Sequence, residues 1–346
     1  MKRALAEARK GLGRVHPNPL VGAVLVKKDK VIGSGAHEMF GKAHAEVNAI
    51  LSSKIDPAGA TLYVTLEPCR HFGKTPPCTN FILKHGIKKV VIASRDLNPV
   101  VAGKGIQALK KAGVRVVTGV MEKEALELNK DYFHWIKRKM PYAVVKVAQS
   151  LDGKISTAGG QSRWITAKAS RIFGHRLRAE SDATLVGVET VLKDDPLLRR
   201  APIKIILDSH LRTPTNAAVF RRGWVIIAVT KKAPPAKRNK FRSQPAEIIV
   251  TKEKKGRVDL TDLFKKLAAK GIVRVLIEGG GEVIASALAE KLVREIYFFI
   301  APKIIGGKKS VGSVGGKDTV VLNQALSLKH LEFHPIGCDW LAHGVL

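Results

Sequence analysis

The sequence predicts an α/β protein of two domains. Segments with strand and helix patterns alternate along the chain, which is typical of a sheet covered by helices in a three-layer α/β/α arrangement. The length of 346 residues fits two domains of ordinary size. A predicted helix ends in the basic residues 137–139, directly before Met140 and Pro141, and such an end indicates a boundary. We therefore expect domains at residues 1–139 and 140–346.

Hydrophobic periodicity places the individual elements. The first helix carries Leu5, Ala8 and Leu12 on one face, and Gly11 and Gly13 end it. In the first domain we expect strands at 21–26, 31–36, 61–66, 88–93 and 114–118, and helices at 44–51, from Phe81 onward, at 107–112 and at 122–137. In the second domain we expect a strand at 142–148, a helix with Arg178 near its end, and a strand from Val273 that runs into a glycine-rich helix start.

The formal net charge of +31 favours a polyanionic partner when it is taken alone. The Lys and Arg residues, however, are spread along the chain in short pairs, and they are densest at 231–242. Aromatic residues make up only 5% and do not alternate with the cations, as a groove for single-stranded nucleic acid requires. We therefore expect small phosphate-bearing ligands and no nucleic-acid partner.

The cysteine count indicates a reducing compartment. Three cysteines, an odd number without paired spacing, argue against a disulfide framework and favour the cytoplasm. The first ten residues form a mixed amphipathic helix without the apolar region of a signal peptide. No apolar run approaches the roughly 20 residues that span a membrane, so no membrane association is expected.

The stretch from His44 to Cys78 predicts a catalytic zinc site. One histidine and two cysteines, His44, Cys69 and Cys78, are a ligand set that leaves the fourth position of zinc open for water. Glu46 follows the histidine by two residues and is placed to move protons without binding the metal. His-x-Glu followed by Pro-Cys and a second Cys is typical of zinc deaminases that act on nucleobases. The spacing departs from the usual Cys-x-x-Cys, since eight residues separate the two cysteines.

Several longer motifs identify a family. The runs 66–78, 16–23 and 96–105, together with segments of the second half, resemble the bifunctional riboflavin-biosynthesis deaminase/reductases. The resemblance implies a cytidine-deaminase-like domain followed by a dihydrofolate-reductase-like domain. It implies hydrolytic deamination of a diaminopyrimidinone ribose phosphate, with one Zn²⁺ in the deaminase domain. It also implies reduction of the ribosyl group to ribityl with NADPH, and a homo-oligomer, dimer or tetramer.

For the deaminase domain, the resemblance implies a set of residues around the pyrimidine and its ribose phosphate. These positions are Asn18, His37, His71, Lys74, Asp96 and Asn98. The alternative is that Asn18 and Asn98 are turn residues and that His37 lies in a surface loop. Glu67 we interpret as a structural residue that accepts hydrogen bonds from backbone N–H groups.

For the reductase domain, the resemblance implies contacts to NADPH and to the substrate. NADPH would meet Ala148, Trp164, Thr190, Asp194, Ser209 and the turn formed by Gly280, Gly281, Glu282, Val283, Ile284, Ala285 and Ser286. The substrate would meet Ser162, Arg178, Leu198, Arg199 and Glu278. The glycine-rich turn suits a phosphate at a helix start, although it lacks the Rossmann pattern G-x-G-x-x-G. The segment after Pro196 departs from the family, so the choice between Arg199 and Arg200 as the phosphate ligand stays open.

Lys146 and Glu278 are the candidates for proton transfer during the reduction. A different interpretation of Lys146 is a snorkelling residue on an edge strand. For the whole chain three other hypotheses exist: a deaminase with a degenerate second half, a deaminase that binds or edits RNA, and a structural protein with a closed zinc site.

Overall fold

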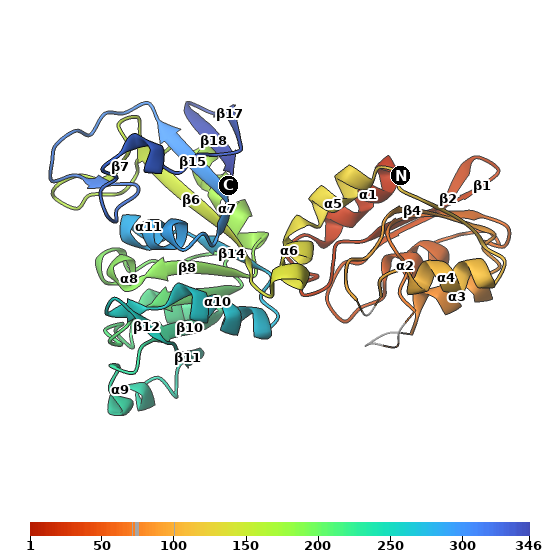
Figure 1. Ribbon diagram of the computed structural model, residues 1–346, viewed down its shortest axis with the longest axis horizontal. Coiled ribbons are helices and arrows are strands. Elements are labelled where there is room, and N and C mark those ends of the chain that lie inside the picture. The colour runs from red at the N-terminus through yellow and green to blue at the C-terminus, as the bar shows by residue number, and fades with distance from the viewer. Residues whose placement is uncertain (71, 73–75, 100) are drawn as a thin grey trace. The chain divides into compact units, whose positions relative to one another are not determined.

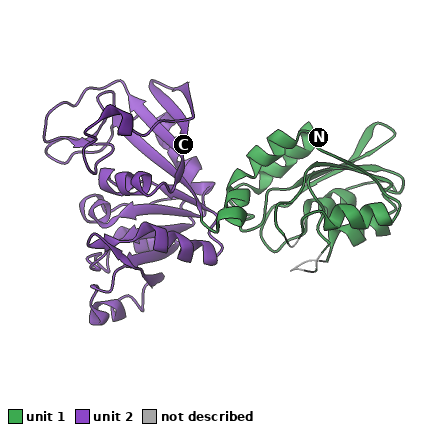
Figure 2. Cartoon of the chain, viewed as in Figure 1, with its two compact units in different colours: residues 1–140 green, residues 141–346 purple. Residues whose placement is uncertain are grey.

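The computed structural model describes residues 1–70, 72, 76–99 and 101–346. The chain forms two compact units, residues 1–140 and 141–346, which are coloured separately in Figure 2. Each unit has its own sheet, so each is described by itself. In both units helices cover a sheet, and the predicted α/β class is confirmed.

The first unit is built on a five-stranded sheet with the strand order β2-β1-β3-β4-β5. Its strands are β1 (Gly22–Lys27), β2 (Lys30–Ala36), β3 (Thr61–Leu66), β4 (Lys89–Ser94) and β5 (Arg115–Thr118). Strand β1 is antiparallel to β2 and β3, whereas β3, β4 and β5 run parallel. The carboxyl ends of β3 and β4 therefore meet at one edge of the sheet, where ligand sites of such sheets lie.

Helices cover both faces of this sheet (Figure 1). On one side lie α1 (Lys2–Ala8), α5 (Glu122–Leu128) and α6 (Lys130–Arg138); on the other lie α2 (Ala45–Leu51), α3 (Cys78–Lys84) and α4 (Lys104–Lys111). Gly22 permits the close approach of α1, because a Cβ there would meet the carbonyl oxygen of Ala4 at 2.0 Å. Gly35 does the same for α2, where a Cβ would lie 2.4 Å from the amide nitrogen of Ala49. The three-layer arrangement follows from this packing.

The prediction of one helix over 122–137 is wrong. The helix breaks at Asn129, whose buried side chain pairs with the backbone of Leu20. Its Oδ1 accepts a hydrogen bond from the Leu20 amide at 2.7 Å, and its Nδ2 donates one to the Leu20 carbonyl at 2.9 Å. A residue 109 positions away thus determines the break, and such a partner leaves no local signal in the sequence.

Several other boundaries differ from the prediction; α4, for example, begins at Lys104 and not at residue 107. The first α-helix ends at Ala8 and continues as a 3₁₀ turn, η1 (Arg9–Gly11), so Leu12 is 38% exposed and does not extend the buried face of Leu5 and Ala8. Helix α3 begins at Cys78, three residues before the predicted start at Phe81. The earlier start places the second cysteine in the first turn of a helix.

The second unit is built on a nine-stranded sheet with the order β11-β10-β9-β8-β14-β6-β15-β18-β17. These strands are β6 (Tyr142–Ser150), β8 (Ala183–Gly187), β9 (Ile203–Leu207), β10 (Trp224–Val229), β11 (Ala246–Val250), β14 (Arg274–Ile277), β15 (Val293–Ala301), β17 (His330–Ile336) and β18 (Asp339–Val345). Strand β6 pairs in parallel with both β14 and β15, so Lys146 does not lie on an edge strand. The edge-strand interpretation of Lys146 is therefore wrong.

The remaining elements of this unit are helices and short ribbons. The helices are α7 (Lys168–Ala179), α8 (Val188–Asp194), α9 (Pro235–Asn239), α10 (Leu260–Ala269) and α11 (Gly281–Ala289), with 3₁₀ turns η2 (Ala218–Arg221) and η3 (Leu322–Gln324). Two-stranded ribbons join β12 (Glu253–Lys254) to β13 (Arg257–Val258), and β7 (Lys154–Ser156) to β16 (Val311–Gly312).

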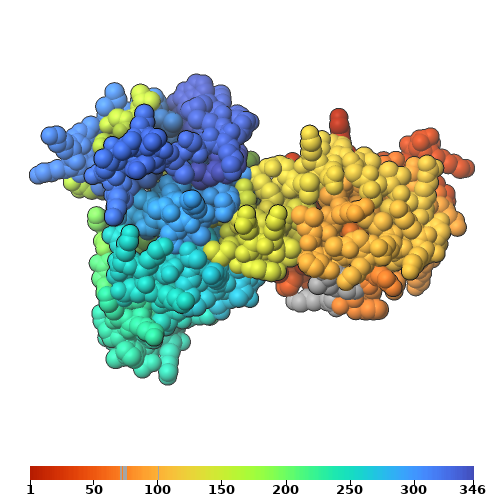
Figure 3. Space-filling model, viewed as in Figure 1, coloured from red at the N-terminus to blue at the C-terminus, as the bar shows by residue number. Residues whose placement is uncertain are grey.

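The densest run of basic residues, 231–242, contains helix α9. Helix α9 buries none of its residues, and its teal region forms the tip of the second unit in Figure 3. Within the described ranges, the helices are all too short or too polar to cross a membrane.

Candidate active sites

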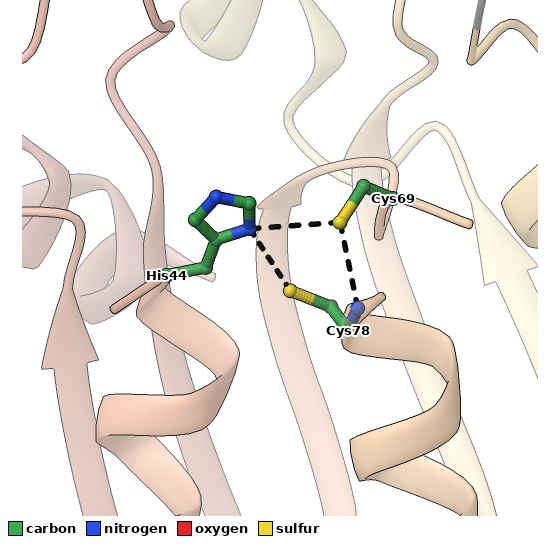
Figure 4. A group of neighbouring side chains, drawn as sticks. All are labelled: His44, Cys69 and Cys78. Carbon is green, nitrogen blue, oxygen red and sulfur yellow. Dashed lines mark hydrogen bonds between the residues drawn. The ribbon is translucent and has the colours of Figure 1, made fainter. Parts of the chain in front are cut away.

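Three side chains from separate elements of the first unit converge on one point (Figure 4). His44 immediately precedes α2, Cys69 follows the end of β3, and Cys78 is the first residue of α3. The Nδ1 atom of His44 lies 3.1 Å from the Cys78 sulfur and 3.5 Å from the Cys69 sulfur. Their possible ligand atoms all lie within 4.8 Å of one another.

This geometry fits a tetrahedral zinc ion. With Zn–N near 2.0 Å and Zn–S near 2.3 Å, neighbouring ligand atoms of a tetrahedron lie about 3.5–3.8 Å apart. The nitrogen–sulfur distances are close to that value, and they identify Nδ1 as the ligand atom of His44. The pKa of the Cys69 thiol is lowered, first by a hydrogen bond with Cys78 and then by one with His44. A thiolate at this position is what a metal requires.

Glu46 lies beside the cluster, in the first turn of α2, and it lines a cavity of about 460 Å³ together with His44 and Cys69. Its residue is only 3% exposed. Burial first, and then the negative charge of Cys69, raise the pKa of Glu46 to about 7. A carboxyl group with a pKa near neutrality can both accept and release a proton at working pH.

The same cavity collects the other described residues that the sequence predicted for this site. They are Asn18, His37, Asp96 and Asn98. Tyr132 and Trp135 of α6 also line this cavity. The sequence predicts only that both residues lie in a helix over 122–137, and it does not indicate them as site residues. The predicted residues His71 and Lys74 lie outside the described residues.

Asn18 and His37 form a hydrogen-bonded pair in this cavity. The Nδ1 atom of His37 lies 3.1 Å from the carbonyl oxygen of Ala43, which can only accept, so Nδ1 carries the proton. Its Nε2 atom then accepts from Nδ2 of Asn18 at 3.1 Å. Burial lowers the pKa of His37, which agrees with a neutral ring. His37 is 2% exposed, and the surface-loop alternative is therefore wrong.

Asp96 and Asn98 shape the loop after β4. The Oδ1 atom of Asp96 accepts a hydrogen bond from the Asn98 amide at 2.8 Å, which is the bond of a turn. The hydroxyl of Tyr132 donates to the same oxygen at 3.4 Å. Burial raises the pKa of Tyr132, so the phenol stays protonated and keeps this bond. The two loop residues thus have a structural role as well as a place in the cavity wall.

Glu67 fixes the backbone next to Cys69. Its carboxylate accepts hydrogen bonds from the amides of Gly103, Gly105 and Ile106 at 3.0–3.2 Å, at the start of α4. The structural interpretation of Glu67 is confirmed. Gly105 lies so close that a Cβ there would approach the carbonyl oxygen of Pro68 to 1.9 Å. The residue before the metal ligand is therefore packed directly against α4.

The second unit contains a larger cavity, of about 670 Å³, at the carboxyl ends of β8 and β9. Seven of the residues predicted to contact NADPH line it: Thr190, Ser209, Gly280, Gly281, Glu282, Val283 and Ser286. Gly280 is the N-cap of α11 and Gly281 is its first residue, and the amides at the start of a helix suit a phosphate.

The other predicted NADPH contacts lie away from the walls of this cavity. Ile284 is only 2% exposed, and Ala285 lies against Gly316. Trp164 is 65% exposed and stacks on the Arg171 guanidinium, 4.5 Å from the ring centre. Asp194 accepts a hydrogen bond from Ser162 at 3.4 Å, and Ala148 lies in the central strand β6.

The predicted substrate residues Arg178 and Glu278 form a two-pronged ion pair. Nε donates to Oε1 at 2.7 Å and Nη2 to Oε2 at 2.6 Å. Burial opposes ionisation of Glu278, but Lys146 and Arg178 outweigh burial, so the pKa of Glu278 is lowered. Burial lowers the pKa of Lys146, while Glu278 opposes that shift. The three groups are thus coupled, and Lys146 is the better proton donor of the two candidates.

Leu198 and Arg199 line a third cavity, of about 400 Å³, that the sequence did not predict as a unit. Its other cationic or titratable wall residues are His175, Arg200, Lys204 and Arg222. Lys204 is only 1% exposed and donates to the carbonyl oxygens of Val219 and Arg222. Arg199 and Arg200 both line this cavity. Either arginine, as the phosphate ligand, would therefore place the phosphate in the same basic cavity.

Two family models match the chain. Residues 1–94 match the cytidine and deoxycytidylate deaminase zinc-binding region, and residues 141–342 match the RibD C-terminal domain. The riboflavin biosynthesis protein RibD of Actinobacillus pleuropneumoniae is 42% identical over 99% of this chain and 93% of its own length. That of Aquifex aeolicus is 43% identical over 98% of this chain and 95% of its own length.

Solved structures agree as well. The deaminase/reductase of Thermotoga maritima superposes with a TM-score of 0.89 at 36% identity, over 100% of this chain and 97% of that one. RibD of Acinetobacter baumannii superposes with a TM-score of 0.90 at 34% identity, over 99% and 97%. The fold and the sites define a two-domain enzyme that joins a zinc-type deaminase to a reductase. The chain belongs to the RibD family of bifunctional riboflavin-biosynthesis enzymes.

Proposed function

We propose that the chain catalyses two consecutive steps of riboflavin biosynthesis. The first is hydrolytic deamination of 2,5-diamino-6-(5-phosphoribosylamino)pyrimidin-4-one. The second is NADPH-dependent reduction of the ribosyl side chain of 5-amino-6-(5-phosphoribosylamino)uracil to ribityl. We assign the first step to residues 1–139 and the second to residues 140–346. The observation that carries the proposal is the His44, Cys69 and Cys78 cluster beside buried Glu46, on a chain whose second unit has its own cavity.

In the deamination, His44, Cys69 and Cys78 would hold one zinc ion. Bound zinc lowers the pKa of a water molecule to about 7 and so supplies hydroxide. Glu46 takes up a proton and returns it to the departing amine, which leaves as ammonia. Its pKa of about 7 suits both directions of that transfer. Asn18 and His37 hold one wall of the cavity, and Asp96 and Asn98 hold the loop after β4.

In the reduction, bound NADPH would supply a hydride. Its pyrophosphate would lie at the amides of Gly280 and Gly281, where α11 begins. Lys146 donates the accompanying proton from its ammonium group, because the lowered pKa makes it a stronger acid than an ordinary lysine. Glu278, ionised and held by Arg178, orients Lys146 and meets the sugar hydroxyls rather than acting as an acid. Arg199 and its basic cavity would receive the ribose phosphate.

A homo-oligomer also belongs to this proposal. Strand β17 lies at the edge of the nine-stranded sheet, and it leaves Leu331 and Phe333 46% and 56% exposed. Leu331 and Phe333 are two residues apart on this strand, so their side chains lie on the same face of the sheet and form an exposed apolar patch that a second copy related by a twofold axis would cover. We place the enzyme in the cytoplasm, because Cys69 and Cys78 act as zinc ligands only while they are reduced.

The test is to supply the diaminopyrimidine ribose phosphate to the purified chain and to identify the products by mass spectrometry. Without NADPH, the product is the aminouracil ribosyl phosphate, together with one equivalent of ammonia. With NADPH, the product is heavier by two hydrogens. Ammonia release without any NADPH oxidation in the second reaction would refute the reductase assignment and leave a deaminase with a degenerate second half.

A further inference from the structure

The 670 Å³ cavity of the second unit has a basic wall that the proposed reaction does not require. Besides the glycine-rich start of α11, the described residues that line it include Lys193, His210, Arg212, Lys255 and Arg257. The pyrophosphate of a dinucleotide is already provided for by the amides of Gly280 and Gly281. The cations of this wall therefore call for another anionic group.

Two segments carry most of these cations, and a hydrogen bond joins them. His210 and Arg212 belong to the loop after β9, and Lys255 and Arg257 belong to the β12–β13 hairpin. The amide of Val258, at the end of the hairpin, donates to Oγ of Ser209 at 3.1 Å. The hairpin is thereby held against the loop, and the two segments form adjacent parts of one cavity wall.

The acidic groups of the cavity are already occupied. Among the described lining residues the carboxylates are Glu189 and Glu282, which pair with Arg212 at 2.5 Å and with Arg257 at 3.0 Å. An enzyme that uses NADH commonly presents a free carboxylate to the 2′-hydroxyl of the ribose, whereas an arginine accommodates the 2′-phosphate of NADPH. All four side chains are at least 47% exposed, so these surface pairs contribute little and open readily for a stronger anion.

We propose that the loop after β9 and the β12–β13 hairpin form the 2′-phosphate clamp of the reductase, with Arg212, Lys255 and Arg257 as the residues that distinguish NADPH from NADH. The inference rests on the proposed use of NADPH and adds the residues that select it. A phosphate dianion between two guanidinium groups and an ammonium group makes charge-assisted hydrogen bonds that the 2′-hydroxyl of NADH cannot replace.

The test compares binding of 2′,5′-ADP and 5′-AMP, which differ only in the 2′-phosphate, by isothermal titration calorimetry on the full chain. The wild type should bind 2′,5′-ADP at least about tenfold more tightly. In K255Q/R257Q, and separately in R212Q, this ratio should fall toward one while affinity for 5′-AMP is kept. The ratio of kcat/KM for NADPH to that for NADH should fall in parallel.

The matched control is K254Q, which removes a cation from the same hairpin. Lys254 pairs with Glu290 at 3.1 Å and does not line the cavity, so its exchange should leave the ratio unchanged. An unchanged ratio in both test variants would overturn the clamp, as would an equal loss of affinity for both nucleotides. A wild type that binds both nucleotides equally would refute the clamp alone. A wild type that binds neither, and oxidises no NADPH, would refute the proposed cofactor itself.

Discussion

Arg178 and Glu278, which lie 100 positions apart in the sequence, are joined by two parallel hydrogen bonds of 2.7 and 2.6 Å. Their side chains are only 17% and 7% exposed. This pair connects α7 to the end of β14, and it faces Lys146 through Glu278. Lys146, the proposed proton donor of the reduction, therefore interacts with a buried charge pair, and we expect its site to depend on that pair.

Breaking this pair from one side should destabilise the second unit. R178M leaves the carboxylate of Glu278 buried without its main partner, and the free energy of unfolding should fall by about 3 kcal/mol. Urea unfolding, followed by the fluorescence of the second unit, measures the change. R178M/E278M should lose less than the sum of the two single variants, because neither member of the Arg178–Glu278 pair is left buried without the other. Additive losses would contradict a direct coupling.

The same pair gives the stability a pH dependence. The pKa of Glu278 in the folded chain lies below its ordinary value of 4.5, so its contribution is present above about pH 4.5 and is lost as the pH falls further. E278Q should therefore be less stable than the wild type at pH 7, and the difference should narrow on acidification. Thermal melts of both proteins from pH 7 to pH 3 measure this, and a constant difference would exclude the lowered pKa.

Replacing Glu46 should separate the two activities. E46A removes the proton carrier of the deaminase site, and the rate of ammonia release should fall by a factor of about 10²–10⁴. NADPH oxidation on the already deaminated intermediate should continue at the wild-type rate. The exposed neighbour Glu38 provides the control, and E38A should leave both rates unchanged. Full ammonia release by E46A would remove the role assigned to this residue.

Zinc content should follow the cysteine ligands. C69S and C78S should each lose stoichiometric zinc in metal analysis, together with ammonia release, while C338S should keep both. Cys338 is exposed and lies in the second unit, so it is a fair control for the exchange of a thiol. Stoichiometric zinc in the ligand variants would show that the metal is held elsewhere.

Lys146 should determine how the rate of the reduction declines at alkaline pH. Since its ammonium group has a lowered pKa, kcat should decline with rising pH well before the ordinary lysine value of 10.5. K146M should lose the reduction at every pH and should still bind NADPH, because Lys146 does not line the 670 Å³ cavity. Nucleotide binding is read from fluorescence. A K146M variant with an unchanged pH profile would exclude Lys146 as the donor.

Sequence reasoning reached the metal site because its residues lie in short, specific motifs. His44 and Cys69 are next to a predicted helix start and a predicted strand end, whereas the helix that begins at Cys78 was expected to begin at Phe81. Glu46 could be predicted because it lies two residues after His44 in the sequence. The sequence could not indicate partners that lie far apart in the chain, such as Asn129 and Leu20.

The second unit was harder to predict for the same reason. The glycine-rich turn predicts a phosphate-binding site, and its first residues line the 670 Å³ cavity. The basic residues around it come from a hairpin and a loop that are joined by a hydrogen bond between Val258 and Ser209, 49 positions apart. Lys204 looks like one more surface lysine in a chain of net charge +31, but it is buried against two carbonyl oxygens.

The packing of Gly105 against Pro68 has a consequence for how sequence changes in this enzyme should be interpreted. Gly105 is not itself a metal ligand, but a side chain there would clash with the carbonyl oxygen of Pro68, the residue before Cys69. A mutational screen for inactive variants would therefore recover substitutions on α4 whose only biochemical effect is weaker metal binding. Such variants would respond to added zinc, whereas a lost ligand would not.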